Sequence, residues 1–87
     1  MDVTAEVVRT LDEVLSLNGR SNTFTRATHL LGAVPELDSM AVVSLVTGLE
    51  DRFGIVVDDS DIDGDVFATV GSLCDFVVRK LEGQTAV

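Results

Sequence analysis

The 87-residue chain is long enough for one small domain with a single core, but too short for a separate catalytic cleft with its own walls. Its 15 acidic and 6 basic residues give a net charge of −9, which argues against nucleic acid and anionic membranes and favours docking to basic protein surfaces. No apolar run reaches the ~20 residues of a membrane span and no secretory signal is present, so we expect a cytoplasmic protein without membrane insertion.

The first predicted element is an amphipathic helix from Val3 to Leu17. Its apolar residues recur at steps of three and four with charged residues between them, which is typical of a helix packed on a core. Asn18-Gly19 should end this helix, because both residues tolerate the left-handed conformation. A long polar loop from Arg20 to Glu36 follows, and Phe24 is its expected anchor.

One histidine and one cysteine are too few for a Cys/His zinc site or an internal disulfide. His29 lies in the polar loop and should face solvent. Cys74 should be a small core residue, because no basic neighbour marks its thiol as reactive.

The second predicted helix runs from Ser39 to about Phe53. Pro35 fixes its own backbone, and Asp38 is a typical capping residue, so the helix should begin at or beside Ser39. The serine hydroxyl would then lie at the positive end of the helix dipole, where free N–H groups can hold an anion such as phosphate. Ser39 is therefore a candidate modification site, although an Asp-Ser pair before an apolar run is also an ordinary helix cap.

The apolar residues of this helix predict a wide apolar face. Four of them are expected on one side (Met40, Val43, Val46 and Phe53), and four more should widen it (Ala41, Val42, Leu45 and Leu49).

The remaining chain predicts two further helices. Gly54 should end the second helix, and Ile55–Val57 should cross as a short extended segment. A short third helix or turn is expected around Ser60–Val66. A fourth helix, capped by Thr69, should span Val70–Leu81, and residues 82–87 should form a flexible tail. The sequence thus predicts one all-α domain over residues 1–87, a bundle of three main helices and one short helix.

Several segments together resemble the acyl carrier protein family. They are Leu37-Asp38-Ser39-Met40, the helix ending Leu49-Glu50-Asp51-Arg52-Phe53-Gly54-Ile55, and Phe67-Ala68-Thr69-Val70-Gly71-Ser72-Leu73. The resemblance spans most of Leu37–Leu81, and it implies a four-helix carrier fold with a long first loop. It also implies that a phosphopantetheinyl transferase attaches 4′-phosphopantetheine to Ser39, and that the thiol of this arm carries acyl or aminoacyl groups as thioesters between enzymes.

The expected partner surface lies on the second helix. We expect loading and transfer enzymes with basic docking surfaces to contact Asp38, Met40, Glu50 and Asp51, and we expect the carrier to be a monomer. Fatty-acid carriers often place acids on the early turns of this helix, where this sequence has Ala41, Ser44 and Thr47. Docking near the arm should therefore be less acidic and more apolar. The run Leu37-Asp38-Ser39-Met40-Ala41-Val42-Val43 is similar to stand-alone carriers of specialised bacterial clusters, such as those associated with exosortase and exopolysaccharide genes.

Other interpretations stay open at this point. A serine hydrolase is not expected, because no Gly-x-Ser-x-Gly motif is present and the single histidine lies in the polar loop. Asp59, Asp61, Asp63 and Gly64 fit the opening of an EF-hand calcium loop, but its twelfth position is Val70 instead of a glutamate. A helical interaction module without a prosthetic group is a further alternative.

A secondary hypothesis concerns the carried acyl chain. The apolar residues expected at the seam between the second and third helices could part to shelter it, although a tightly packed core would use the same residues (Val43, Val46, Ile62, Val66 and Phe67).

Overall fold

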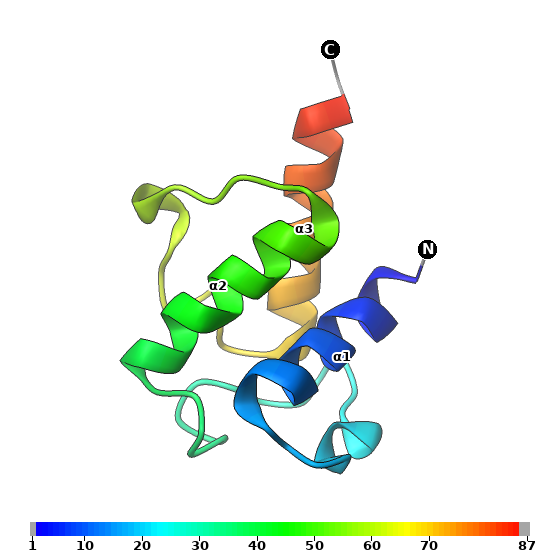
Figure 1. The fold of residues 1–87 in the computed structure, drawn as a ribbon, viewed down its shortest axis with the longest axis vertical. Coiled ribbons are helices and arrows are strands. Elements are labelled where there is room, and N and C mark those ends of the chain that lie inside the picture. Colours follow the sequence, from blue (N-terminus) through cyan, green and yellow to red (C-terminus); the bar gives the residue numbers. More distant parts are fainter. Residues whose placement is uncertain (1, 86–87) are drawn as a thin grey trace.

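The computed structural model describes residues 2–85, which fold into three α-helices and two 3₁₀-helices. These elements are α1 (Val3–Leu15), η1 (Arg20–Thr23), α2 (Ser39–Phe53), η2 (Asp59–Asp61) and α3 (Val70–Thr85). Helix α1 packs closely against both α2 and α3, whereas α2 and α3 meet more sparsely (Figure 1). The all-α architecture predicted from the sequence is confirmed, with one of the four expected helices reduced to the 3₁₀-helix η2. None of the helices in residues 2–85 is long and apolar enough to cross a membrane.

The core is built from one apolar face of each α-helix and from loop residues between them. Its helical members are Val7, Leu11 and Leu15 of α1, Leu45, Val46, Leu49 and Phe53 of α2, and Val70, Leu73, Cys74, Phe76 and Val77 of α3. Cys74 is buried as expected, and burial raises the pKa of its thiol, which disfavours the reactive thiolate.

Helix α1 ends two residues earlier than predicted. Ser16 already adopts the left-handed conformation with φ 53°, and both its N–H and that of Leu17 donate to the Asp12 carbonyl. Leu17 is buried in the loop after the helix. Left-handed Asn18 and Gly19 then continue the turn that the sequence pattern had placed at the helix end.

The expected helix around Ser60–Val66 is replaced by η2 and a series of turns. Two aspartates explain the difference: Asp61 Oδ2 accepts the Asp58 N–H at 3.0 Å, and Asp63 Oδ1 accepts the Val66 N–H at 3.0 Å. Such local bonds from side chain to backbone compete with helical hydrogen bonding.

Helix α3 begins at Val70 as predicted but continues to Thr85 instead of ending at Leu81. Gly83 does not adopt a positive φ, so nothing in its backbone ends the helix. Residues 82–85, which were predicted to lie in the tail, are therefore helical, and residues 86 and 87 of the predicted tail lie outside the described residues.

The long loop before α2 is held by backbone contacts to the start of α3. His29 and Thr69 form an isolated antiparallel bridge, and the N–H of Leu30 donates to the Ala68 carbonyl at 2.9 Å. The His29 residue is exposed, as predicted. Phe24 is half-buried against the core, which confirms its anchoring role.

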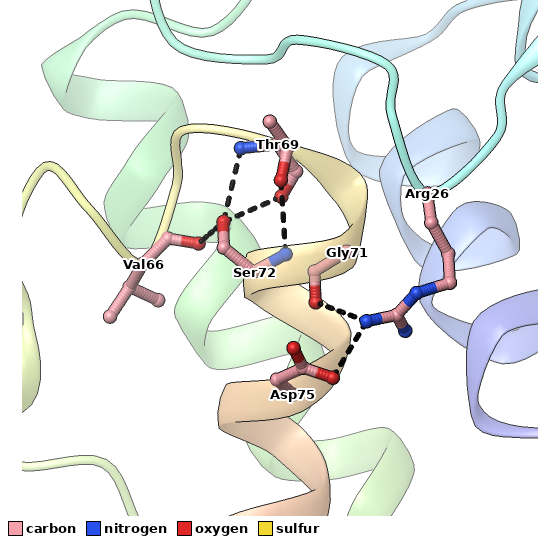
Figure 2. A network of polar contacts seen from close by, with 6 residues as sticks. All are labelled: Arg26, Val66, Thr69, Gly71, Ser72 and Asp75. Carbon is pink, nitrogen blue, oxygen red and sulfur yellow. Dashed lines mark hydrogen bonds and ion pairs between the residues drawn. The ribbon is translucent and has the colours of Figure 1, made fainter.

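Figure 2 shows how Arg26 of this loop meets the first turn of α3. The Arg26 guanidinium donates to Asp75 Oδ1 at 2.8 Å, and Thr69 and Ser72 exchange hydrogen bonds between side chain and backbone N–H, as in a capping box. The Arg26 carbonyl accepts the Gly71 N–H at 2.9 Å, so the two backbones lie very close.

This close approach makes Gly71 sensitive to substitution. A Cβ at position 71 would lie 2.9 Å from the Arg26 carbonyl oxygen, so the loop would have to shift. We expect Gly71→Ala to lower the free energy of unfolding by about 1–3 kcal/mol in urea titrations, although alanine favours helix. Gly83→Ala is the matched control in the same helix: nothing lies within 4 Å of its Cβ position, and it should stabilise by up to about 1 kcal/mol. A stabilising Gly71→Ala would contradict the close approach.

Candidate functional site

The turn that precedes α2 is anchored by three buried apolar side chains, Leu30, Val34 and Leu37. The Val34 N–H donates to the Leu30 carbonyl at 2.9 Å, and the Leu37 N–H donates to the Val34 carbonyl at 3.0 Å. These contacts fix the position from which the chain enters α2. The entry segment, residues 35–38, is nevertheless partly exposed at the surface.

Asp38 starts the helix as the sequence predicted. Its backbone is extended, its carboxylate accepts the Ala41 N–H at 2.8 Å, and its carbonyl accepts the Val42 N–H at 2.9 Å. Ser39 is thus the first helical residue, and its side chain is exposed. The capping contact fixes the backbone on which the Ser39 hydroxyl is presented.

Loss of this cap should loosen the first turn of α2. We expect Asp38→Ala to lower the free energy of unfolding by about 1 kcal/mol, because an N–H of the first turn loses its acceptor. Urea unfolding monitored by circular dichroism measures the change. Asp38→Asn is the matched control and should remain within about 0.5 kcal/mol of the unsubstituted protein, since asparagine caps equally well. Equal losses in both variants would assign the effect to charge instead of capping.

Glu36 joins the same entry segment to η1 through an ion pair with Arg20. A hydrogen bond from its own backbone N–H and the Arg20 guanidinium hold the pKa of the Glu36 carboxyl below its usual range. The side chain is therefore charged at neutral pH and braces the turn before Ser39.

No catalytic partner accompanies Ser39 in the described part of the chain. Its hydroxyl makes no side-chain hydrogen bond within residues 2–85, and His29 is bridged through its backbone to Thr69 at the start of α3. A serine nucleophile needs a base within hydrogen-bond reach. The geometry therefore presents Ser39 as a residue for another protein to act on.

The outer face of α2 differs from the sequence prediction. Met40 is 78% exposed and Val43 is 64% exposed, whereas Val46, which was expected to share their side, is only 8% exposed. The reason is geometric: each three-residue step along an α-helix falls about 60° short of a full turn, so residues 40, 43 and 46 drift around it. Steps of four residues from Leu45 to Leu49 and Phe53 define the buried face.

The other predicted partner residues lie near the far end of α2. Asp51 is exposed, whereas Glu50 is half-buried and its carboxylate accepts the Val57 N–H at 2.9 Å. Glu50 therefore also ties the end of α2 to the segment that follows it. Val43 was missed as a surface residue, and the four-residue spacing from Leu45 to Leu49 was the signal that could have identified it.

Not all of the residues predicted at the seam between the second and third helices lie there. Val43 lies at the surface and is removed from the set, while Val46, Val66 and Phe67 are buried and Ile62 is partly buried. The sheltering of an acyl chain stays a prediction for these four residues.

The acidic segment that fits an EF-hand opening is engaged in structural contacts. Lys80 of α3 donates to Asp61, and this contact lowers the pKa of the Asp61 carboxyl. Asp63 accepts a backbone N–H in the turn after η2. No group of three or more potential metal ligands occurs among the described residues. The helix that should lead into a calcium loop is also missing here, because α2 ends at Phe53 and residues 55–58, directly before Asp59, are not helical.

Comparison with known proteins identifies the family. Residues 36–77 match the family model described as the phosphopantetheine attachment site. Among solved structures, the chain is similar to the holo acyl carrier protein from Nitrosomonas europaea, determined by solution NMR, with 46% identity over 94% of this chain and 99% of that chain and a TM-score of 0.87. No curated protein sequence matches the chain significantly. The chain belongs to the acyl carrier protein family.

The family determines the general function. The protein is a carrier and not an enzyme, and its cofactor is covalently attached 4′-phosphopantetheine. It interacts with a phosphopantetheinyl transferase and with enzymes that handle acyl groups. The resemblance stated from the sequence is therefore confirmed, and neither the calcium-binding alternative nor the interaction module without a prosthetic group is favoured.

Proposed function

We propose that Ser39 is the residue that carries the 4′-phosphopantetheine arm. The observation that supports this most strongly is the position of Ser39 as the exposed first residue of α2, directly after the Asp38 cap. The matched segment holds three other serines: Ser44 lies within α2, Ser60 lies in η2, and the Ser72 hydroxyl is engaged with the Val66 and Thr69 carbonyls.

The surroundings of Ser39 fit a phosphodiester. The first N–H groups of an α-helix lack intrahelical acceptors, and the helix dipole stabilises a nearby negative charge by roughly 0.3–1 kcal/mol. When bound, the arm supplies a terminal thiol that holds acyl or aminoacyl groups as thioesters. No base is hydrogen-bonded to the Ser39 hydroxyl within residues 2–85, so the transferase must accept the hydroxyl proton. The bond between Ser39 Oγ and phosphorus then forms as the pyrophosphate bond of coenzyme A breaks, and adenosine 3′,5′-bisphosphate leaves.

We further propose that partner enzymes contact the outer surface of α2 through Asp38, Met40, Glu50 and Asp51. The strongly negative charge supports steering toward partners with basic surfaces, because nine acids and Arg52 alone lie between Glu36 and Asp65. The carrier is proposed to be a single cytoplasmic domain that acts as a monomer, without nucleic-acid or membrane partners.

The test is modification of the purified protein with a broad-specificity phosphopantetheinyl transferase, coenzyme A and magnesium. Intact mass should increase by one phosphopantetheine, and peptide mapping should place it on the peptide that contains Ser39. Attachment at another serine, or a folded protein left unmodified by several such transferases, would refute the assignment of Ser39.

A further inference from the structure

A pocket of about 380 Å³ opens at the surface between η1 and residues 28–35, and we call it the loop pocket. Both segments lie at the end of the molecule where α2 begins, in the lower part of Figure 1. The lining is mostly apolar: Leu17 and Val34 are buried, Phe24 is half-buried, and Ala33 and Pro35 are exposed. The volume is within the range of about 300–1,000 Å³ that is typical of small-molecule sites.

The loop pocket differs in charge from the rest of the surface. The chain carries 15 acidic residues, yet no aspartate or glutamate of the described residues lines this pocket. Four other surface pockets each include at least one acidic residue. The one permanent charge in the lining is that of Arg20, whose guanidinium is ion-paired with Glu36. An ion therefore finds no unpaired permanent charge here, and the lining fits an uncharged apolar group.

The walls of the loop pocket are held by contacts that need no ligand. On the η1 side, the Arg20 N–H donates to the Leu17 carbonyl at 3.1 Å. On the other side, the Ala33 N–H donates to the Leu30 carbonyl at 3.1 Å. The ion pair between Arg20 and Glu36 joins η1 to the turn before α2. The pocket is therefore already open and shaped before any group enters it.

The apolar residues at the seam between α2 and the segment after it are buried in the core. They are Val46, Val66 and Phe67, and an acyl chain could enter between them only if they moved apart. Separating packed side chains gives up their contacts, whereas a group that enters the loop pocket covers apolar surface that already faces water. The loop pocket is thus the less costly place for an apolar group.

The loop pocket lies within reach of a group attached to Ser39. Pro35, which lines the pocket, precedes Ser39 by four residues, so their Cα atoms are at most about 14 Å apart. A phosphopantetheine arm has about 14 bonds between the serine oxygen and its sulfur, and it spans roughly 16 Å at the ~1.2 Å per bond of an extended polypeptide. Its thiol can therefore reach the edge of the pocket at Pro35, and an acyl group on the thiol can lie inside.

Covalent attachment makes a weak site sufficient. A short flexible linker holds a tethered group near its site at an effective concentration on the order of millimolar. We propose that the loop pocket binds the apolar acyl group carried on the arm of the same molecule, and this inference rests on the proposed function. The class of cargo that fits this lining is a medium-length aliphatic acyl group, such as octanoyl.

The test compares the amide chemical shifts of two isotope-labelled forms of the protein. The broad-specificity transferase prepares the holo form from coenzyme A and the octanoyl form from octanoyl-coenzyme A. Octanoylation should change the shifts most at Leu17, Phe24 and Val34 of the loop pocket. If the largest changes fall instead on the three seam residues, or if only the residues next to Ser39 change, the inference is overturned.

Ala33→Asp tests the pocket by placing a carboxylate in its apolar lining. Ala33 is exposed, so the helices should remain formed, as circular dichroism would show. In the unsubstituted protein, Tm should rise by about 4 °C or more from the acetyl to the octanoyl form, because the acyl group binds only the folded state. Ala33→Asp should remove at least about half of this rise, because the acyl group would meet a charge.

Ala27→Asp is the matched control for this variant. Ala27 is also an exposed residue of the same loop, and it does not line the pocket. The same substitution there adds the same charge to the loop, and it should leave the rise in Tm within about 1 °C of that in the unsubstituted protein.

The outcomes separate this inference from the proposed function. If coenzyme A adds no phosphopantetheine at Ser39, the proposed function fails and this inference fails with it. If Ser39 is loaded but Ala33→Asp and Ala27→Asp show the same rise in Tm, the loop-pocket inference alone is overturned. If the transferase shifts the pocket amides of the holo form and octanoylation does not, the pocket is a contact for a protein partner, and the inference is likewise overturned.

Discussion

Replacement of Ser39 by alanine is expected to abolish attachment of phosphopantetheine completely. The substitution removes the only atom of this residue that can form the phosphodiester, and no other serine of the matched segment starts a long helix. Intact mass after prolonged incubation with transferase, coenzyme A and magnesium should equal that of the unmodified chain. Because Ser39 is exposed and Asp38 supplies the cap, stability should change by less than about 0.5 kcal/mol.

Ser44→Ala is the matched control for this experiment. Ser44 is also an exposed serine of α2, little more than one turn from Ser39, but it lies within the helix. The Ser44→Ala variant should therefore gain one phosphopantetheine, as the unsubstituted protein does. A Ser39→Ala variant that still gains this mass, or a Ser44→Ala variant that does not, would place the attachment on a different residue.

The sequence was most informative where local chemistry sets the structure. Helix α2 has the predicted bounds, because a capping aspartate starts it and Gly54 ends it in the left-handed conformation with φ 66°. These two signals act within a few residues of the chain. The position of Ser39 at the start of the helix could therefore be predicted without any tertiary information.

Prediction was weaker where several local signals compete, or where contacts between segments far apart in the sequence determine the structure. The aspartates around η2 form bonds to nearby N–H groups that shorten the expected helix. The bridge between His29 and Thr69 joins residues that are 40 positions apart, and no periodic pattern marks it. The exposed position of Val43 follows only when the buried face is fixed by Leu45 and Leu49.

The two sides of α2 should respond differently to truncation. Leu45 is fully buried in the core, whereas Val43, two residues earlier, is 64% exposed. Leu45→Ala is expected to lower the free energy of unfolding by about 3 kcal/mol, within the range of 2–5 kcal/mol for cavities left by leucine, as measured by urea titration. Val43→Ala removes an exposed side chain and favours helix, so it should change stability by less than about 0.5 kcal/mol.

A loss of about 3 kcal/mol is large for a small domain, whose total stability is typically about 5–15 kcal/mol. Leu45→Ala should nevertheless remain a substrate of the transferase at temperatures well below its midpoint, because Leu45 is fully buried and is not part of the exposed surface around the Ser39 hydroxyl. Met40→Glu, at an exposed residue of the proposed partner surface, is expected to show the reverse pattern, with near-normal stability and a reduced kcat/KM for attachment. If Leu45→Ala slowed attachment at temperatures where it is fully folded, the inner side of α2 would also shape the partner surface, and the assignment of separate roles to the two sides would be wrong.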